Sequence, residues 1–280
     1  MHQKLAESVN EVRKIPGSSF THLNLPEHRK LILASDMDWW TERIARFPEG
    51  YSPCNTLVTE RIHPFPRPVR EKLIDHFCPK QLRDQIKNNR SDEDCLVRPY
   101  LGRRGTTSSK FFTLRNRSLH IDQMTKLNLP VNEYAKVMAD VLAICYWHAK
   151  IDANDMEFVL APAGSHPESE TWNSKVLGKH TMWILDFDCV KEISLDEAGV
   201  EQAALAFLRN DPYFPRPCGE KKEDRKLWVV FKERFLKTSS LILSGDSDLP
   251  GKFISRVEEM AERKRERMKG LNGHWDGIAV

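Results

Sequence analysis

The sequence lacks several features that would place the protein in a simple class. Its six cysteines include no C-x-x-C pair, so neither a zinc site nor a disulfide framework is predicted, and we expect buried, reduced thiols. No run approaches the roughly 20 apolar residues that span a bilayer. Residues 1–15 alternate charged and apolar positions and have no signal-peptide core. We therefore predict a cytosolic protein with no membrane partner.

A strong excess of one charge is also missing. The 280 residues include 43 Lys and Arg against 40 Asp and Glu, which leaves a net charge of +3. A protein that binds nucleic acid without sequence preference usually has a larger excess or a basic tail. Contacts with nucleic acid would therefore have to come from local basic clusters. Hydrophobic residues make up 40% of the chain, which is enough for a folded core.

Apolar periodicity predicts an α+β fold in one compact unit. Residues 1–100 form a smaller mixed region, with an amphipathic helix over the first fifteen residues, a strand near Asn55–Ile62 and a helix near Val69–Phe77. Residues 101–280 form a mostly helical lobe, in which a long buried helix follows Pro130 and leads directly to residues 151–158.

A short β-ribbon follows this long helix in the prediction. Its strands are the apolar runs Glu157–Ala161 and Thr181–Leu185, joined by a stretch rich in Pro, Gly and Ser. Ser194 and Glu197 then fit a capping box at the start of a helix that ends near Asn210. Two more helices are expected near residues 225–236 and 251–269.

Five carboxylates are concentrated beside this ribbon. The loop D-A-N-D-M-E carries three and the end of W-I-L-D-F-D carries two, namely Asp152, Asp155, Glu157, Asp186 and Asp188. Alternate residues of a strand share a face, so Asp186 and Asp188 are expected to point together into a cleft beside Glu157. Such carboxylates can bind a guanidinium or ammonium group or act as a general base. The alternative is that each acid only solvates a turn or caps a helix.

These two segments resemble the catalytic core of protein kinases and aminoglycoside phosphotransferases. Asp152 stands at the position of the catalytic aspartate, and Asp186 at that of the metal-binding aspartate before Phe. The resemblance implies a kinase-like fold for the lobe. Three departures weaken the implied ATP chemistry. Glu157 replaces the metal-binding asparagine, Lys150-Ile151 replaces His-Gly or His-Arg, and no Gly-rich loop or V-A-I-K strand precedes them.

Two basic stretches are candidates for phosphate contacts. L-G-R-R-G-T-T-S-S-K-F-F-T-L-R-N has no G-K-[ST] and is not a P-loop, but its cations and backbone can approach phosphates. The candidate substrate-binding residues in it are Arg103, Arg104, Lys110, Arg115 and Asn116. A solvated loop is the alternative interpretation. The second stretch, Arg263–Lys269, alternates with glutamates, so pairing within a helix explains it adequately.

Several longer blocks, taken in order, resemble a family of fungal proteins that have been described as hypothetical or as zinc-finger proteins. The blocks lie between about Leu96 and Pro217 and include R-P-Y-L-G-R-R, F-T-L-R-N, H-I-D-Q-M, D-A-N-D-M-E-F-V-L, W-I-L-D-F-D and F-L-R-N-D-P-Y-F-P-R-P. Members of this family are arginine-containing cyclodipeptide synthases. They take aminoacyl groups from transfer RNA and close them into cyclo-Arg-Xaa diketopiperazines.

The resemblance implies arginyl-tRNA and a second aminoacyl-tRNA as partners, without a cofactor or a metal. On this interpretation Asp152 and Asp155 hold or deprotonate the attacking amine, and Glu157, Asp186 or Asp188 binds the guanidinium. An acyl-enzyme would need a nucleophile, for which Ser108, Ser109 and Cys145 are nearby in sequence. Two alternatives stay open: an ATP-dependent small-molecule phosphotransferase, and a non-catalytic, pseudokinase-like module that binds a partner or RNA.

Overall fold

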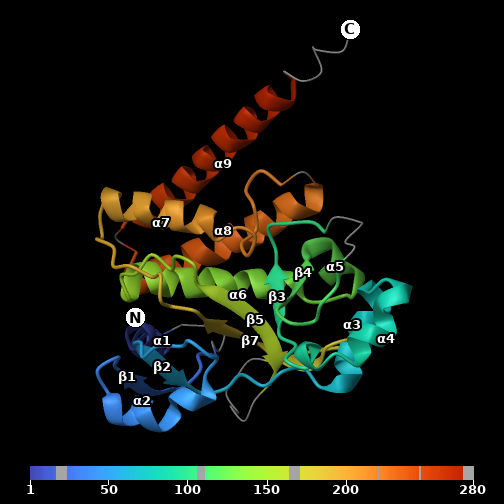
Figure 1. Cartoon of the computed structure of the whole chain (residues 1–280). Coiled ribbons are helices and arrows are strands. Elements are labelled where there is room, and N and C mark those ends of the chain that lie inside the picture. The colour runs from blue at the N-terminus through green and yellow to red at the C-terminus, as the bar shows by residue number, and fades with distance from the viewer. Residues whose placement is uncertain (17–23, 106–110, 164–170, 220, 246, 274–280) are drawn as a thin grey trace.

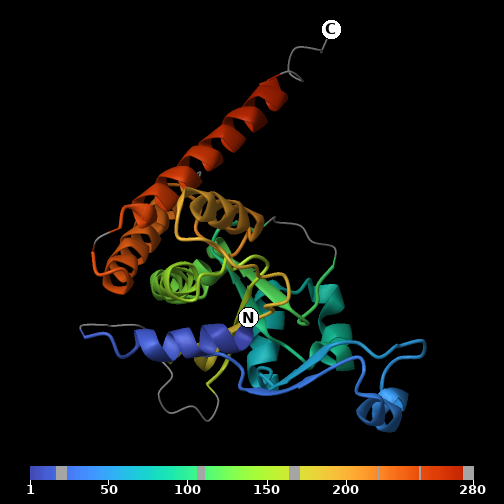
Figure 2. The same cartoon turned by 90° about the vertical axis from the view of Figure 1, so that its left-hand side faces the viewer.

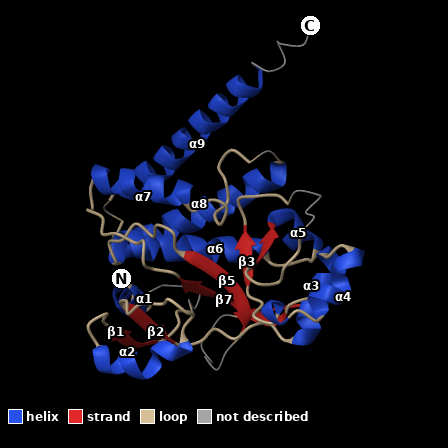
Figure 3. Ribbon diagram, viewed as in Figure 1, coloured by secondary structure: helices blue, strands red, loops and turns tan. Residues whose placement is uncertain are grey.

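Helices and short strands are mixed along the chain, which confirms the α+β prediction (Figure 3). The protein is described from a computed structural model that covers residues 1–16, 24–105, 111–163, 171–219, 221–245 and 247–273, with side chains described as far as Arg267. The α-helices are α1 (His2–Val12), α2 (Met37–Arg43), α3 (Arg67–Phe77), α4 (Arg83–Lys87), α5 (Ile121–Lys126), α6 (Val131–Ala143), α7 (Glu197–Arg209), α8 (Lys222–Ile242) and α9 (Leu249–Gly273). The strands are β1 (His28–Ile32), β2 (Thr56–Thr59), β3 (Val97–Tyr100), β4 (Arg117–His120), β5 (Glu157–Pro162), β6 (Trp172–Ser174) and β7 (Gly178–Leu185). Short turns are η1 (Ile44–Arg46), η2 (Lys80–Leu82), η3 (Arg90–Asp92) and the π-helical η4 (Ile144–His148).

The predicted ribbon is the centre of a larger sheet. β5 and β7 pair antiparallel as expected, with Phe158 opposite Ile184. The ribbon is not an isolated unit, however, because β3 and β6 pair with its outer edges and give the order β4-β3-β5-β7-β6. β6 lies inside the stretch that was predicted to be only a connector. β3 comes from residues before 101 and β4 from residues after it, so one sheet joins the two predicted regions.

Both faces of the central strands are buried, which explains their continuous apolar runs. Phe158 and Leu160 of β5 belong to the main core, together with the side chains of α6. Val159 and Ala161 point to the opposite face, where they form a small cluster with Trp183 of β7. Strand residues alternate between faces, so consecutive apolar residues supply both layers.

The long buried helix predicted after Pro130 is formed by α6 and η4. α6 packs against α8, and Figure 1 shows both lying behind the sheet. A buried ion pair fixes this contact, because Arg234 of α8 donates to both oxygens of Asp140 in α6 at 2.7 Å, while Asp140 is fully buried. Removing one partner of such a pair leaves an uncompensated charge and is strongly destabilising. α6 therefore provides a rigid support for the loop that follows η4.

The start of α7 differs from the predicted capping box. The N-cap is Asp196, whose Oδ1 accepts from the Gly199 backbone N–H at 3.0 Å, and the Ser194 hydroxyl donates to Asp196 at 2.6 Å. A carboxylate is a good N-cap acceptor and here outcompetes the serine two residues earlier. Gly199 is required, because a Cβ atom there would lie 1.8 Å from the Ser194 carbonyl oxygen.

The described residues bear on the predicted lack of a membrane span and on the predicted state of the cysteines. Within the described segments, no helix combines the length and apolar character needed to cross a membrane. All six cysteines are free, and Cys78, Cys95 and Cys145 are buried. The prediction of buried thiols is wrong for Cys189, which is exposed because it lies in the loop after β7.

Candidate functional site

The two acidic segments are held in unusual backbone conformations. The loop 150–156 joins η4 to β5, and Lys150, Ala153 and Asp155 have φ values of 54°, 53° and 60°. Asp186, directly after β7, has a φ of 67°. Left-handed conformations at residues other than glycine cost free energy and persist where surrounding contacts enforce them. Several contacts through buried or partly buried hydrogen bonds hold this loop.

Asp152 is one of these contacts. Its side chain is 3% exposed and accepts hydrogen bonds from the backbone N–H groups of Lys191 (2.9 Å) and Asn154 (3.1 Å) and from the Gln202 side-chain amide (2.9 Å). The Asp152 N–H donates to the Lys191 carbonyl at 2.9 Å. This carboxylate connects the loop, the segment after β7 and helix α7. Its oxygens point into the protein and not into the proposed cleft.

Asn210, at the C-terminal end of α7, holds the other end of the loop. Its buried side-chain amide donates to the backbone carbonyls of Met156 at 2.9 Å and Ala153 at 3.3 Å. Gln202 and Asn210 therefore fix the loop from a single helix. Sequence reasoning placed neither residue in the site, although Asn210 opens the N-D-P-Y string that carried part of the family resemblance. An asparagine at a helix end is usually interpreted as a cap, so the sequence pattern did not indicate that Asn210 contacts the loop.

The other four acidic residues lie close together. Asp155, Glu157, Asp186 and Asp188 interact electrostatically, and we call them the carboxylate cluster. Partial burial, a hydrogen bond to Asp188 and the charges of Asp188, Glu157 and Asp155 together raise the pKa of Asp186 to about 6. The expected proximity of Asp186 and Asp188 is present, but β7 ends at Leu185, so a left-handed turn and not strand alternation produces it.

Arg98 of β3 is the cation that contacts this cluster. Its Nη2 atom lies 2.6 Å from Oε2 of Glu157, and both side chains are more than three-quarters buried. Burial raises the pKa of Glu157, and the opposing charge of Arg98 offsets part of that rise. Burial opposes the charge of Arg98 too, but Tyr213, Glu157 and Tyr100 more than compensate and raise its pKa. Sequence reasoning did not indicate this ion pair, although Arg98 opens the R-P-Y-L-G-R-R block.

The surroundings of Arg98 include polar atoms that are buried and unsatisfied. The Tyr213 hydroxyl lies near the Phe158 backbone and the Arg98–Glu157 pair, and it makes no hydrogen bond of normal geometry with the described residues. The Nε atom of Arg98 is also buried and has no hydrogen-bond partner among the described residues. Tyr100 packs edge-on against Tyr213 with ring centroids 5.1 Å apart. Buried polar groups are normally paired, and exceptions are frequent at sites that receive a ligand or a water molecule.

The cations predicted to bind the substrate do not pair with the carboxylate cluster where the structure describes them. Arg104 pairs with Asp224 of α8, with 2.9 Å between Nε and Oδ2, and so is occupied in joining two parts of the fold. Arg103 and Arg115 are exposed, and Asn116 is exposed with a φ of 50° at the turn before β4. Lys110 lies outside the described residues. Of the described cations, Arg98 and not these residues is paired with the carboxylate cluster.

Of the candidate nucleophiles, the structure describes Cys145, and it also bears on a possible metal site among the described residues. Cys145 is fully buried in η4, and burial raises the pKa of its thiol, which disfavours the thiolate. Ser108 and Ser109 lie outside the described residues. In the described part of the chain, no three His, Cys, Asp or Glu side chains are arranged to hold a metal ion.

Comparison with known proteins gives one partial match. The family DUF3669, whose description is "Zinc finger protein", matches residues 182–247, a segment that begins within β7 and ends shortly after α8. This segment contains Asp186, Asp188, Gln202, Asn210 and Tyr213, but it has two cysteines and no histidine. No curated protein and no solved structure matches the chain.

Proposed function

We propose that this protein is a tRNA-dependent cyclodipeptide synthase that joins arginine from arginyl-tRNA to a second aminoacyl group and releases a cyclo-Arg-Xaa diketopiperazine. The observation that carries the proposal is the carboxylate cluster, in which Asp186 has a pKa of about 6 beside three further acids. The sequence blocks that resemble the arginine-containing family support it. The match of residues 182–247 to a family described as zinc-finger proteins agrees with the label carried by those relatives.

An arginyl substrate has two cationic groups, and the cluster offers a partner for each. The guanidinium is planar and prefers a carboxylate that can accept two parallel hydrogen bonds. Asp155 and Asp188 are exposed, so they can receive it. Glu157 is already paired with Arg98, so its role in this scheme is electrostatic: its charge contributes to the raised pKa of Asp186. This assignment moves the guanidinium contact away from Glu157, the residue that a kinase-like pattern would make a metal ligand.

The α-ammonium group of the substrate must lose a proton before it can attack. Asp186 accepts this proton, since a base with a pKa near 6 is largely deprotonated at neutral pH and still binds a proton readily. The free amine then attacks the ester carbonyl of the other aminoacyl-tRNA, a C–N bond forms, the C–O bond to the ribose breaks, and the ribose oxygen takes the proton. A second attack of the same kind closes the ring and releases the second tRNA. Both esters are already activated, so positioning and proton transfer suffice.

Asp152 takes a positioning role in this scheme. Its oxygens accept three hydrogen bonds inside the protein, and Gln202 and Asn210 hold the same loop. Asp155 and Glu157 lie at the far end of that loop, so their placement depends on these contacts. This revises the sequence-based interpretation in which Asp152 contacts the amine directly.

The test is to incubate the purified protein with arginyl-tRNA and a mixture of other aminoacyl-tRNAs and to search for cyclo-Arg-Xaa products by mass spectrometry. Asp186→Asn, which keeps the shape and removes the base, is expected to lower the rate about 100-fold or more. Asp38→Asn, at an exposed aspartate of α2, is the matched control and should retain full activity. Absence of any diketopiperazine from every pair of aminoacyl-tRNAs would refute the proposal.

A further inference from the structure

Helix α9 leaves the body of the protein after its packed part ends. Phe253, Ile254 and Val257 are buried, and Met260 packs against the core at its edge. From Arg263 to Arg267 every side chain is exposed. Figures 1 and 2, which differ by a quarter turn, both show the helix projecting away from the other elements. This part of α9 buries no apolar surface, so core packing does not explain it.

The projecting segment is strongly basic. Residues 263–267 read R-K-R-E-R, four cations and one anion, in a chain whose net charge is only +3. Lys264 and Arg267 form no ion pair with the described residues, whereas Arg263 pairs with Glu259 and Arg265 with Glu262. Exposed pairs of this kind contribute little free energy, so their arginines can exchange partners readily. The pairing within the helix, which the sequence suggested as a full explanation, therefore leaves the segment with excess positive charge.

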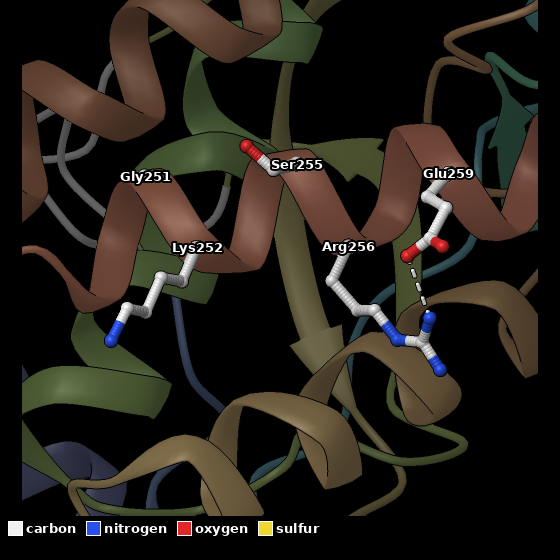
Figure 4. Close-up of a pocket in the computed structure, with 5 residues that line it drawn as sticks. All are labelled: Gly251, Lys252, Ser255, Arg256 and Glu259. Atoms are coloured by element: carbon white, nitrogen blue, oxygen red, sulfur yellow. Dashed lines mark hydrogen bonds and ion pairs between the residues drawn. The ribbon is translucent and has the colours of Figure 1, made fainter.

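The cations also continue a row along one face of the helix. Lys252, Arg256, Arg263 and Arg267 follow one another at intervals of four or seven residues and so share a face. In the packed part this face lines a cavity of about 610 Å³ with Gly251, Lys252, Ser255, Arg256 and Glu259, shown in Figure 4. There the cations are neutralised by α7, since Lys252 pairs with Glu197 at 2.9 Å and Arg256 with Glu201. Glu201 also interacts electrostatically with Arg263, but α7 forms no ion pair with Arg263 or Arg267 among the described contacts.

We propose that the projecting segment Arg263–Arg267 of α9, called the α9 spoke, docks the phosphate backbone of RNA. An extended row of cations on a rigid rod complements a polyanion with regularly spaced charges, and RNA phosphates supply such a row. The proposal rests on the proposed function in naming transfer RNA as the RNA, because the carboxylate cluster itself would repel phosphate. A basic element apart from the carboxylate cluster can bind the RNA phosphates, so that only the aminoacyl end of the tRNA has to reach the carboxylates.

The test compares tRNA binding by two full-length triple variants. The first, Lys264→Ala with Arg265→Ala and Arg267→Ala, removes one Lys and two Arg from the α9 spoke. The matched control, Arg29→Ala with Lys30→Ala and Arg46→Ala, removes the same types of exposed cation from β1 and η1. Circular dichroism checks that both variants fold. Fluorescence anisotropy with labelled, uncharged total tRNA is measured at several salt concentrations.

We expect the spoke variant to bind tRNA about tenfold or more weakly at low salt, with a salt slope smaller by about 2 to 3, and the control to bind as the unchanged protein does. Equal affinity of the spoke variant and the unchanged protein would overturn the proposal, as would equal losses in both variants. Competition by polyglutamate as effective as that by tRNA would assign the spoke to acidic peptides instead. The proposed function fails separately: RNA binding that depends on the spoke without any diketopiperazine would refute the synthase and leave the docking surface standing.

Discussion

Two carboxylates of one small region, Asp152 and Asp186, have opposite surroundings. Asp152 is buried and accepts three hydrogen bonds from donors in the loop, the segment after β7 and α7. Asp186 is exposed, lies beside three other acids, and has a raised pKa. A fully paired carboxylate stabilises a fold, whereas one crowded by like charges destabilises it and is available for chemistry.

The difference suggests how the region is built. α7 contributes neutral amides, Gln202 and Asn210, to the inner side of the loop, and β3 contributes one cation, Arg98, to the outer side. The inner contacts fix the backbone at φ values that its residues disfavour, and the outer side then presents acids that no local contact satisfies fully. Under the proposed function, stability and proton transfer therefore depend on different carboxylates of this region.

The largest expected effect is a difference in the free energy of unfolding between variants of Asp152 and Asp186. Asp152→Ala leaves two backbone N–H groups and the Gln202 amide without their acceptor, so we expect the free energy of unfolding to fall by about 3 kcal/mol. Asp186→Asn removes the repulsion between like charges that raises the pKa of Asp186, so it should raise the free energy of unfolding at neutral pH. Urea unfolding followed by tryptophan fluorescence measures both. Equal losses in the two variants would remove the distinction between inner and outer carboxylates.

The sequence predicted the elements of this region better than their contacts. Apolar runs located β5, β7 and α6 because burial on both faces, or along one helical stripe, leaves a strong periodic signal. Spacing also located the five acids. It did not reveal that Asp152 turns inward, because its donors come from Lys191 and Gln202, 39 and 50 residues later. Arg98 and Glu157 are 59 residues apart, so only the pairing of β3 with β5 brings them into contact.

The next effect concerns pH. A raised pKa means that folded Asp186 holds its proton more tightly than the unfolded chain does, so protonation favours the folded state. The stability that this proton contributes is present below the ordinary value of 3.8 and is lost as the pH rises to about 6. The Asp186→Asn variant cannot ionise at this position and does not lose this stability. Its free energy of unfolding relative to that of the unchanged protein should therefore increase between pH 4 and 6 and level off above. A flat profile for Asp186→Asn across this range would contradict the raised pKa.

The smallest effect tests whether Arg98 controls the outer carboxylates. Arg98 neutralises Glu157 at 2.6 Å, and the charge of Glu157 is one of the factors that raise the pKa of Asp186. Arg98→Gln should therefore raise the pKa of Asp186 further, and Glu157→Gln should lower it, as followed by carbon NMR of the carboxyl group. Combining both changes should bring the value between the two, because the pair acts as one unit. If Arg98→Gln leaves the pKa of Asp186 unchanged while Glu157→Gln shifts it, the arginine serves only to bury the glutamate, and the electrostatic coupling between Arg98 of β3 and the carboxylate cluster is refuted.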